Sequence, residues 1–257
     1  MNDVFTLFSQ RFWAARWLYG QYWLMLLLAG LAGGVGALLG WLAMRNITAV
    51  TLFAAIFATV AATFVVGAMF ATGRTAMLNL PGDGIWQEGL RNWGPVWGII
   101  LTLLVWYMLV LVASGIVAIP FVFVALSHVH APVTGGAAFA TAFQGAGLLW
   151  VLIPVAVVCL LATPFPLALL GAMFMGGFDA LHAIGPAFRA GYSRPGFWRY
   201  IAVDLLLGIL AAAVQAFLHV FPAAGVLLGL FVFEPLLIWI NIVLIFAVWR
   251  TLPYGLG

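Results

Sequence analysis

The residue whose type and position most favour chemistry is Glu234, which lies in the middle of the last apolar stretch and directly precedes Pro235. An ionised carboxylate deep in a bilayer is costly unless it is protonated, paired or hydrated. If the last two stretches form a hairpin around residues 222–225, Gln215 lies at nearly the same depth and can donate a hydrogen bond to Glu234. Glu234 is then either an ion-coupling carboxylate, as in transporters, or a structural hydrogen-bond acceptor that orients the hairpin.

A second acidic residue, Asp204, comes five residues after Arg199 at the start of the fifth apolar stretch. Asn241 lies at a comparable depth on the sixth stretch. A salt bridge between Asp204 and a cytoplasmic arginine is the simplest explanation for a carboxylate near a membrane boundary.

Two prolines within three residues, Pro164 and Pro166, interrupt the fourth apolar stretch. A proline inside a helix removes one backbone donor, so each leaves a carbonyl without its usual partner near the bilayer centre. Such carbonyls either line a substrate site or are enclosed in a packed kink.

The composition argues against several kinds of catalytic and cofactor site. No lysine is present, which removes the amine needed for a Schiff base or a Gly-Lys phosphate loop. The single cysteine, Cys159, is expected to be a small buried hydrophobe. His128 and His130 are too few ligands for a metal site, and Ser114 has no histidine at its depth to act as a general base. We therefore expect no catalytic residue, no metal and no cofactor.

The elements that position these residues are transmembrane helices. Hydrophobic residues make up 67% of the 257 residues and charged residues 6%, against roughly 25% charged residues in soluble domains. A helix needs about 20 apolar residues to cross the hydrocarbon layer. The sequence predicts an all-α polytopic membrane protein, a single transmembrane domain over residues 1–257, with six spans near 22–44, 49–72, 96–124, 147–175, 200–220 and 225–249.

Arginine placement predicts the orientation, because loops that stay in the cytoplasm keep positive charge. With the N-terminus in the cytoplasm, every arginine except Arg45 falls on the cytoplasmic side. Both termini of this multi-pass protein are then cytoplasmic. The net charge of +3 favours contact with anionic lipid headgroups at these arginines. It does not indicate nucleic-acid binding, which needs a basic face on a soluble module.

Three segments that combine arginine with aromatic residues precede the first, third and fifth spans, at residues 2–17, 83–93 and 180–194. Their spacing is typical of amphipathic helices that lie in the headgroup plane. This pattern predicts three hairpins, each preceded by a cytoplasmic interfacial helix. The alternative is that arginine and tryptophan simply gather at any membrane boundary.

Glycines at small-xxx-small spacing indicate close helix contacts, either within the chain or in a homo-oligomer. They occur in the first and last spans: Gly30, Gly34, Gly36, Gly40, Gly225 and Gly229.

The segment from Phe178-Asp179-Ala180-Leu181-His182 through Arg194-Pro195-Gly196-Phe197-Trp198-Arg199 resembles one that precedes a membrane hairpin in a known group of proteins. These are the YciC-like bacterial inner-membrane proteins and the membrane domain of some glycerophosphodiester phosphodiesterases. The final stretch, from Pro235 to Arg250, is similar to the closing helix of those families. The resemblance implies a six-helix module of the bacterial inner membrane without an established catalytic activity of its own.

Two functions fit these patterns. The first is a non-catalytic inner-membrane protein with a structural, assembly or membrane-homeostasis role, which contacts the lipid bilayer and either itself or another membrane protein. The second is a small proton- or ion-coupled transporter or channel that uses Glu234, Gln215 and the break at Pro164 and Pro166. A transporter needs a continuous polar lining, and the polar residues of the spans are scattered, which favours the first function.

The predicted orientation can be tested by cysteine labelling. In a Cys159→Ala background, the substitution Val133→Cys should react with a membrane-impermeant thiol reagent in intact cells, because the loop over 127–144 is expected outside. Labelling that appears only after lysis would contradict the orientation.

Overall fold

The structure is a computed structural model that describes residues 1–81, 84–127, 146–220 and 222–252, and every regular element in these ranges is a helix. The predicted outer loop, with His128 and His130, lies outside the described residues. The prediction of an all-α polytopic membrane protein is confirmed. Six segments are long and apolar enough to cross a membrane: Trp13–Met44, Ile47–Leu78, Trp86–Val124, Leu148–Met175, Arg194–Leu218 and Gly225–Arg250.

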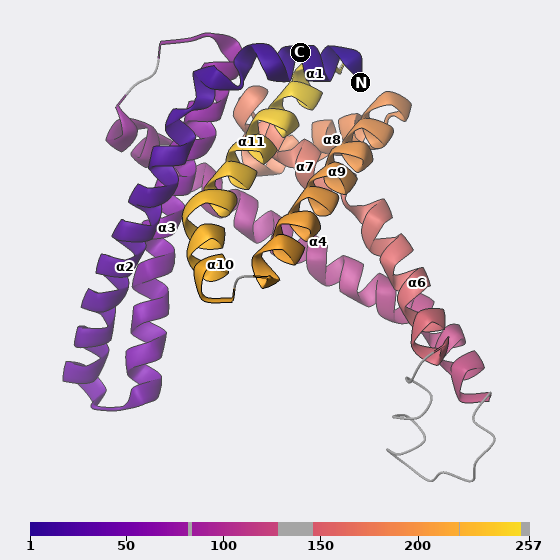
Figure 1. Ribbon diagram of the computed structural model, residues 1–257, viewed down its shortest axis with the longest axis horizontal. Helices are drawn as coiled ribbons and strands as arrows, with labels where there is room; N and C mark the ends of the chain where they lie inside the picture. The colour runs from indigo at the N-terminus through magenta and orange to yellow at the C-terminus, as the bar shows by residue number, and fades with distance from the viewer. Residues whose placement is uncertain (82–83, 128–145, 221, 253–257) are drawn as a thin grey trace.

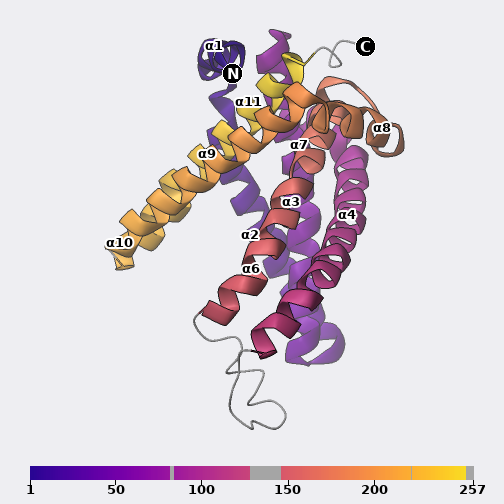
Figure 2. The ribbon, with the colours of Figure 1, turned by 90° about the vertical axis from the view of Figure 1, so that its right-hand side faces the viewer.

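The spans form three antiparallel hairpins, which meet at the end of the molecule that holds the N-terminus and the C-terminal end of α11 (Figures 1 and 2). We call this the convergent end. The hairpins consist of α2 (Trp17–Met44) with α3 (Ile47–Leu78), α4 (Ile85–Ser127) with α6 (Ala146–Ala162) and α7 (Pro164–Leu170), and α9 (Arg194–His219) with α10 (Pro222–Leu228) and α11 (Glu234–Arg250). Shorter elements complete the fold: α1 (Asn2–Arg11), α8 (Ala180–Gly191), the 3₁₀ turn η1 (Trp13–Ala15) and the π-helical turns η2 (Gly171–Met175) and η3 (Gly229–Phe233).

The turn of the first hairpin is made by two residues. Arg45 ends α2 in the left-handed conformation, at φ 47°. Asn46 then caps α3, because its side-chain oxygen accepts a hydrogen bond of 2.9 Å from the backbone N–H of Thr48. Arg45 is thus the one arginine at the far end of the hairpins, and the other eight belong to elements or helix ends at the convergent end.

Glycines of α2 bring the first hairpin into close contact. A Cβ atom added to Gly40 would lie 2.6 Å from the carbonyl oxygen of Ala49, and one added to Gly36 would overlap the carbonyl of Phe53. Gly30 and Gly34 have nothing within 4 Å of such an atom. The predicted small-xxx-small contact in the first span is therefore made within the chain at Gly36 and Gly40, and Gly225 and Gly229 of the last span likewise approach Leu218 of α9.

Helix α11 is the centre of the packing. Half of the most apolar part of the last span, Gly225–Arg250, which contains α11, is buried, against 11–17% for the other five candidate spans. Helix α11 packs against α1, α2, α3, α7, α9 and η2. Small residues of neighbouring elements leave room for its large side chains. A Cβ atom added to Gly171, for example, would lie 2.7 Å from the ring of Trp249. The other spans keep most of their apolar surface on the outside of the protein.

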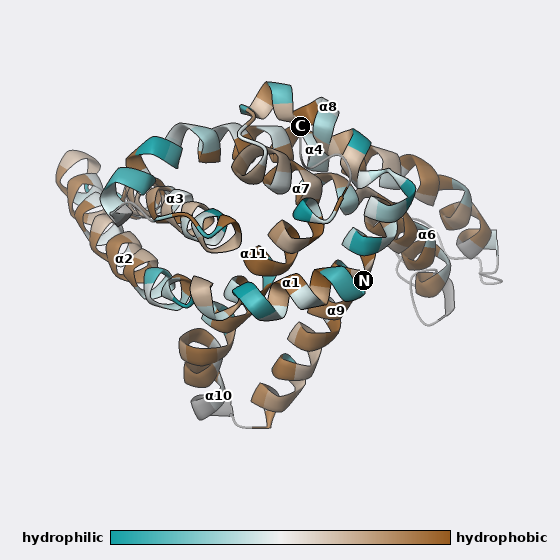
Figure 3. Ribbon diagram, turned by 90° about the horizontal axis from the view of Figure 1, so that it is seen from above, coloured by the Kyte–Doolittle hydropathy of each residue, from teal (hydrophilic) through white to brown (hydrophobic). Residues whose placement is uncertain are grey.

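Two of the three predicted interfacial helices exist as separate elements, α1 and α8. Helix α1 packs against α11, with Val4 fully buried and the rings of Phe12 and Trp239 stacked at 4.0 Å. Residues 85–93 form the first turns of α4 instead, so the separate second interfacial helix was wrongly predicted. Figure 3 looks onto the convergent end and shows hydrophilic residues along α1 and α8, above largely hydrophobic spans.

The close approach of α2 and α3 can be tested by adding side chains. Gly36→Leu and Gly40→Leu should each lower the free energy of unfolding by about 1–3 kcal/mol, because the backbone of α3 occupies the space. Gly30→Leu, on the open face, is the matched control and should leave stability unchanged in denaturant titrations of the purified protein. Equal effects at all three positions would contradict the packing.

Candidate functional site

Glu234 is bound by a tyrosine from the first span. The hydroxyl of Tyr22 on α2 donates a hydrogen bond of 2.6 Å to Oε2 of Glu234, and Tyr22 is only 2% exposed. Gln215 lies on an exposed face of α9 and makes no hydrogen bond within the described part of the chain. The prediction that Gln215 donates to Glu234 is therefore wrong, because Tyr22 reaches the carboxylate from a different hairpin.

A second tyrosine on the same face of α2, Tyr19, bonds to the helix break that Pro235 causes. Pro235 has no N–H, so the carbonyl of Phe231, four residues earlier, lacks its helical donor. The hydroxyl of Tyr19 donates to this carbonyl over 2.9 Å. The ring of Trp23 stacks on the ring of Phe231 at 4.6 Å and 14°.

We call Tyr19, Tyr22 and Trp23 the α2 clamp. These residues are spaced three and four apart, so they share one face of the helix. Together they hold a backbone carbonyl, a carboxylate and an aromatic ring of the last span. The clamp therefore joins residues 212 positions apart in the sequence.

A tyrosine also bonds to the backbone beside the break in the fourth span. Pro164 and Pro166 are both buried, and α6 ends at Ala162 just before them. The hydroxyl of Tyr192 donates to the carbonyl of Leu161 over 3.1 Å. A Cβ atom on Gly191 would lie 3.0 Å from the carbonyl oxygen of Pro164, so α8 covers the break closely. The two prolines thus form a packed kink.

Helix α8 positions Tyr192, which follows its last residue. Asp179 caps the start of α8 by accepting hydrogen bonds from the backbone N–H groups of His182 at 2.9 Å and Leu181 at 3.1 Å. These bonds lower the pKa of Asp179 below its ordinary value, and the bond from the N–H of His182 has the largest effect. Partial burial raises the pKa of Tyr192, so its hydroxyl keeps the proton that it donates.

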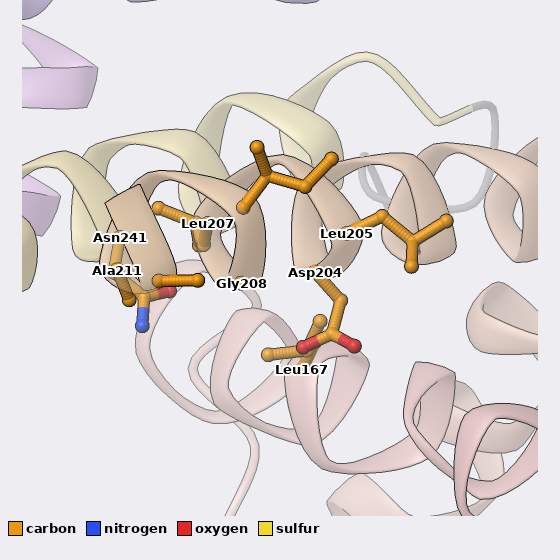
Figure 4. Close-up of a pocket in the computed structure, with 9 residues that line it drawn as sticks. Leu167, Asp204, Leu205, Leu207, Gly208, Ala211 and Asn241 are labelled. Carbon is orange, nitrogen blue, oxygen red and sulfur yellow. The ribbon is translucent and has the colours of Figure 1, made fainter. Parts of the chain in front are cut away.

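A second polar site lies between α7, α9 and α11. Asp204 and Asn241 line a groove of about 500 Å³, in which the carboxylate of Asp204 points toward Leu167 (Figure 4). The rest of the lining is glycine, alanine, leucine and isoleucine. The predicted common depth of Asp204 and Asn241 is consistent with their position in one groove.

Neither polar group of this groove has a partner among the described residues. No arginine nitrogen lies within 4.0 Å of the Asp204 carboxylate, so the predicted salt bridge is wrong. Arg199 instead donates to the carbonyl and hydroxyl oxygens of Thr251, both at 2.9 Å. The side-chain oxygen of Asn241 is buried without a hydrogen bond in the described part of the chain.

A smaller pocket of about 240 Å³ adjoins the groove, because Asp204 and Leu167 line both. Cys159 and Pro166 also line this pocket. Cys159 is exposed on α6, which corrects the prediction of a buried cysteine. The break at Pro166 therefore borders the Asp204 groove, whereas the Glu234 break faces the clamp.

No known protein family, curated protein or solved structure matches this chain. The resemblance of the C-terminal third to YciC-like proteins and to the phosphodiesterase membrane domain therefore stays a prediction. The two polar sites, the α2 clamp and the Asp204 groove, are the observations from which a function can be argued.

The clamp can be tested by removing single hydroxyl groups. Tyr19→Phe and Tyr22→Phe should each lower the free energy of unfolding by on the order of 1 kcal/mol, because each leaves an acceptor without its donor. Tyr200→Phe is the control, since the Tyr200 hydroxyl is buried without a partner among the described residues. Its removal should leave stability equal or higher. A ranking in which Tyr200→Phe is the most damaging change would contradict the clamp.

Proposed function

We propose that this protein is a non-catalytic integral protein of the bacterial inner membrane with a structural, assembly or membrane-homeostasis role. The Tyr22–Glu234 hydrogen bond carries this proposal. The carboxylate best suited to ion coupling is engaged in a bond between the first and last spans. A polar side chain that bonds across helices in this way stabilises helix association within the membrane.

The bonds around α11 support the same role. The indole N–H of Trp239 donates a hydrogen bond of 3.1 Å to the backbone carbonyl of Phe12, which attaches the end of α1 to the last span. The guanidinium of Arg250 donates to the carbonyl of Met77, which fastens the end of α3. Because these contacts and the clamp all end on η3 and α11, the polar groups of the spans serve mainly to hold the hairpins together.

The arginines favour an orientation in which the convergent end faces the cytoplasm. Arg16, Arg91, Arg189 and Arg194 are exposed at or near this end. Positive charge is retained on the cytoplasmic side of membrane proteins and attracts anionic headgroups. We therefore place both termini in the cytoplasm, with these side chains in contact with anionic lipid.

The structural role can be tested at Glu234. Glu234→Gln keeps an oxygen acceptor for Tyr22, so abundance and the free energy of unfolding should match those of the unmodified protein. Glu234→Leu leaves the Tyr22 hydroxyl unpaired and should cost on the order of 1 kcal/mol. Denaturant titration in mixed micelles, with Asp3→Asn as a control for charge removal outside the spans, measures both.

A flux assay separates this role from the transporter alternative. Reconstituted vesicles that contain the unmodified protein should show no pH-dependent ion flux. If they show such a flux and a folded Glu234→Gln protein abolishes it, Glu234 is a coupling carboxylate and the structural proposal is overturned.

A further inference from the structure

The Asp204 groove contains two hydrogen-bond acceptors, the Asp204 carboxylate and the Asn241 side-chain oxygen, that receive no hydrogen bond from the described residues. The Asp204 carboxylate has no arginine within 4.0 Å, and the Asn241 side-chain oxygen is buried without a bond in the described part of the chain. An ionised carboxylate in an apolar span is costly unless it is protonated, paired or hydrated. A positively charged group with several N–H donors would satisfy both acceptors of the groove at once.

The shape and lining of the groove indicate the rest of that partner. A volume of about 500 Å³ is far larger than a single ion requires. Seven of the nine lining residues are aliphatic or glycine, which suits hydrocarbon. One carboxylate and one amide oxygen are too few to hold Ca²⁺, which takes 6–8 oxygen ligands.

The position along α9 places the carboxylate near a headgroup layer. Asp204 lies five residues after Arg199, which is about 7.5 Å at the helical rise of 1.5 Å per residue. Arg199 belongs to the convergent end and is fixed there by Thr251. A lipid whose headgroup lies beside Arg199 can thus bring a cationic group toward Asp204 while its chains follow the aliphatic lining.

We propose that this groove binds a phospholipid with a primary ammonium headgroup, whose N–H groups are accepted by Asp204 and Asn241. A primary ammonium supplies three donors and a positive charge. A quaternary ammonium supplies no N–H donor and is recognised mainly by aromatic faces. None of the nine groove residues is aromatic, and the adjoining pocket that shares Asp204 adds a single ring, that of Tyr107, so the site lacks the aromatic cage that suits a choline headgroup.

Competition between two lipids tests this binding. The purified full-length protein in detergent is mixed with equal amounts of phosphatidylethanolamine and phosphatidylcholine with matched acyl chains, and bound lipid is measured by native mass spectrometry. The protein should retain phosphatidylethanolamine over phosphatidylcholine by on the order of tenfold, because only the first forms the charge-assisted hydrogen bonds.

Two variants with matched controls locate the site. Asp204→Asn should abolish the preference, and Asp3→Asn, which neutralises an exposed carboxylate on α1, should retain it. Gly208→Leu adds a side chain to the groove at an open position, since nothing lies within 4 Å of an added Cβ atom. It should lose bound lipid, whereas Gly30→Leu, equally open but on α2, should retain it. If Asp204→Asn fails to fold, the comparison of Gly208→Leu with Gly30→Leu decides whether the lipid binds in this groove.

Three results would overturn the proposal. The first is equal retention of the two lipids by the unmodified protein. The second is an unchanged preference in folded Asp204→Asn or Gly208→Leu protein. The third is displacement of the lipid by an equal concentration of free ethanolamine, which would assign the groove to a soluble amine instead.

Discussion

A proline in a transmembrane helix leaves a backbone carbonyl that the bilayer cannot satisfy, and this constraint organises the arrangement of the spans. In the last span, the carbonyl freed by Pro235 is that of Phe231, and its donor is Tyr19 of the first span. Since Tyr22 then reaches Glu234 from the next turn of α2, the first hairpin has to pack against the last one. The helix break thus specifies which hairpins are neighbours.

In the fourth span, Pro164 and Pro166 leave the carbonyls of Leu160 and Ala162 without their helical donors, and the N–H of Thr163 donates to that of Leu160 over 3.3 Å. Tyr192, from the end of α8, donates to the neighbouring carbonyl of Leu161. A π-helical turn, η2 or η3, lies close to the break in both spans. Because α8 connects the second hairpin to the third, the Tyr192 bond fixes where α9 begins. Two tyrosine-to-carbonyl bonds therefore hold the convergent end, while the spans separate beyond it (Figure 2).

The sequence predicted what depends on composition and local spacing. Six spans, the kink at Pro164 and the importance of Glu234 follow from hydropathy, proline chemistry and the cost of a buried carboxylate. The donor to Glu234 could not be predicted, because hairpin depth suggested Gln215 whereas the packing of α2 against α11 presents Tyr22. The sequence contained part of the signal, since Pro235 requires a donor for Phe231 and α2 carries two tyrosines three residues apart, but nothing local assigns one helix to the other.

The two carboxylates within the third hairpin differ in one respect that bears on function. Glu234 has its donor within the chain, so its hydrogen bond contributes to the association of the spans. Asp204 lies in a groove whose other lining residues are mostly aliphatic. The nearby Arg199 donates its hydrogen bonds to Thr251, and no cationic group of the described residues lies within 4.0 Å of the Asp204 carboxylate. An ionised carboxylate without a partner lowers the stability of the fold. Its position is therefore better explained by a group from outside the chain, which makes Asp204 the stronger candidate for recognition and Glu234 the stronger candidate for structure.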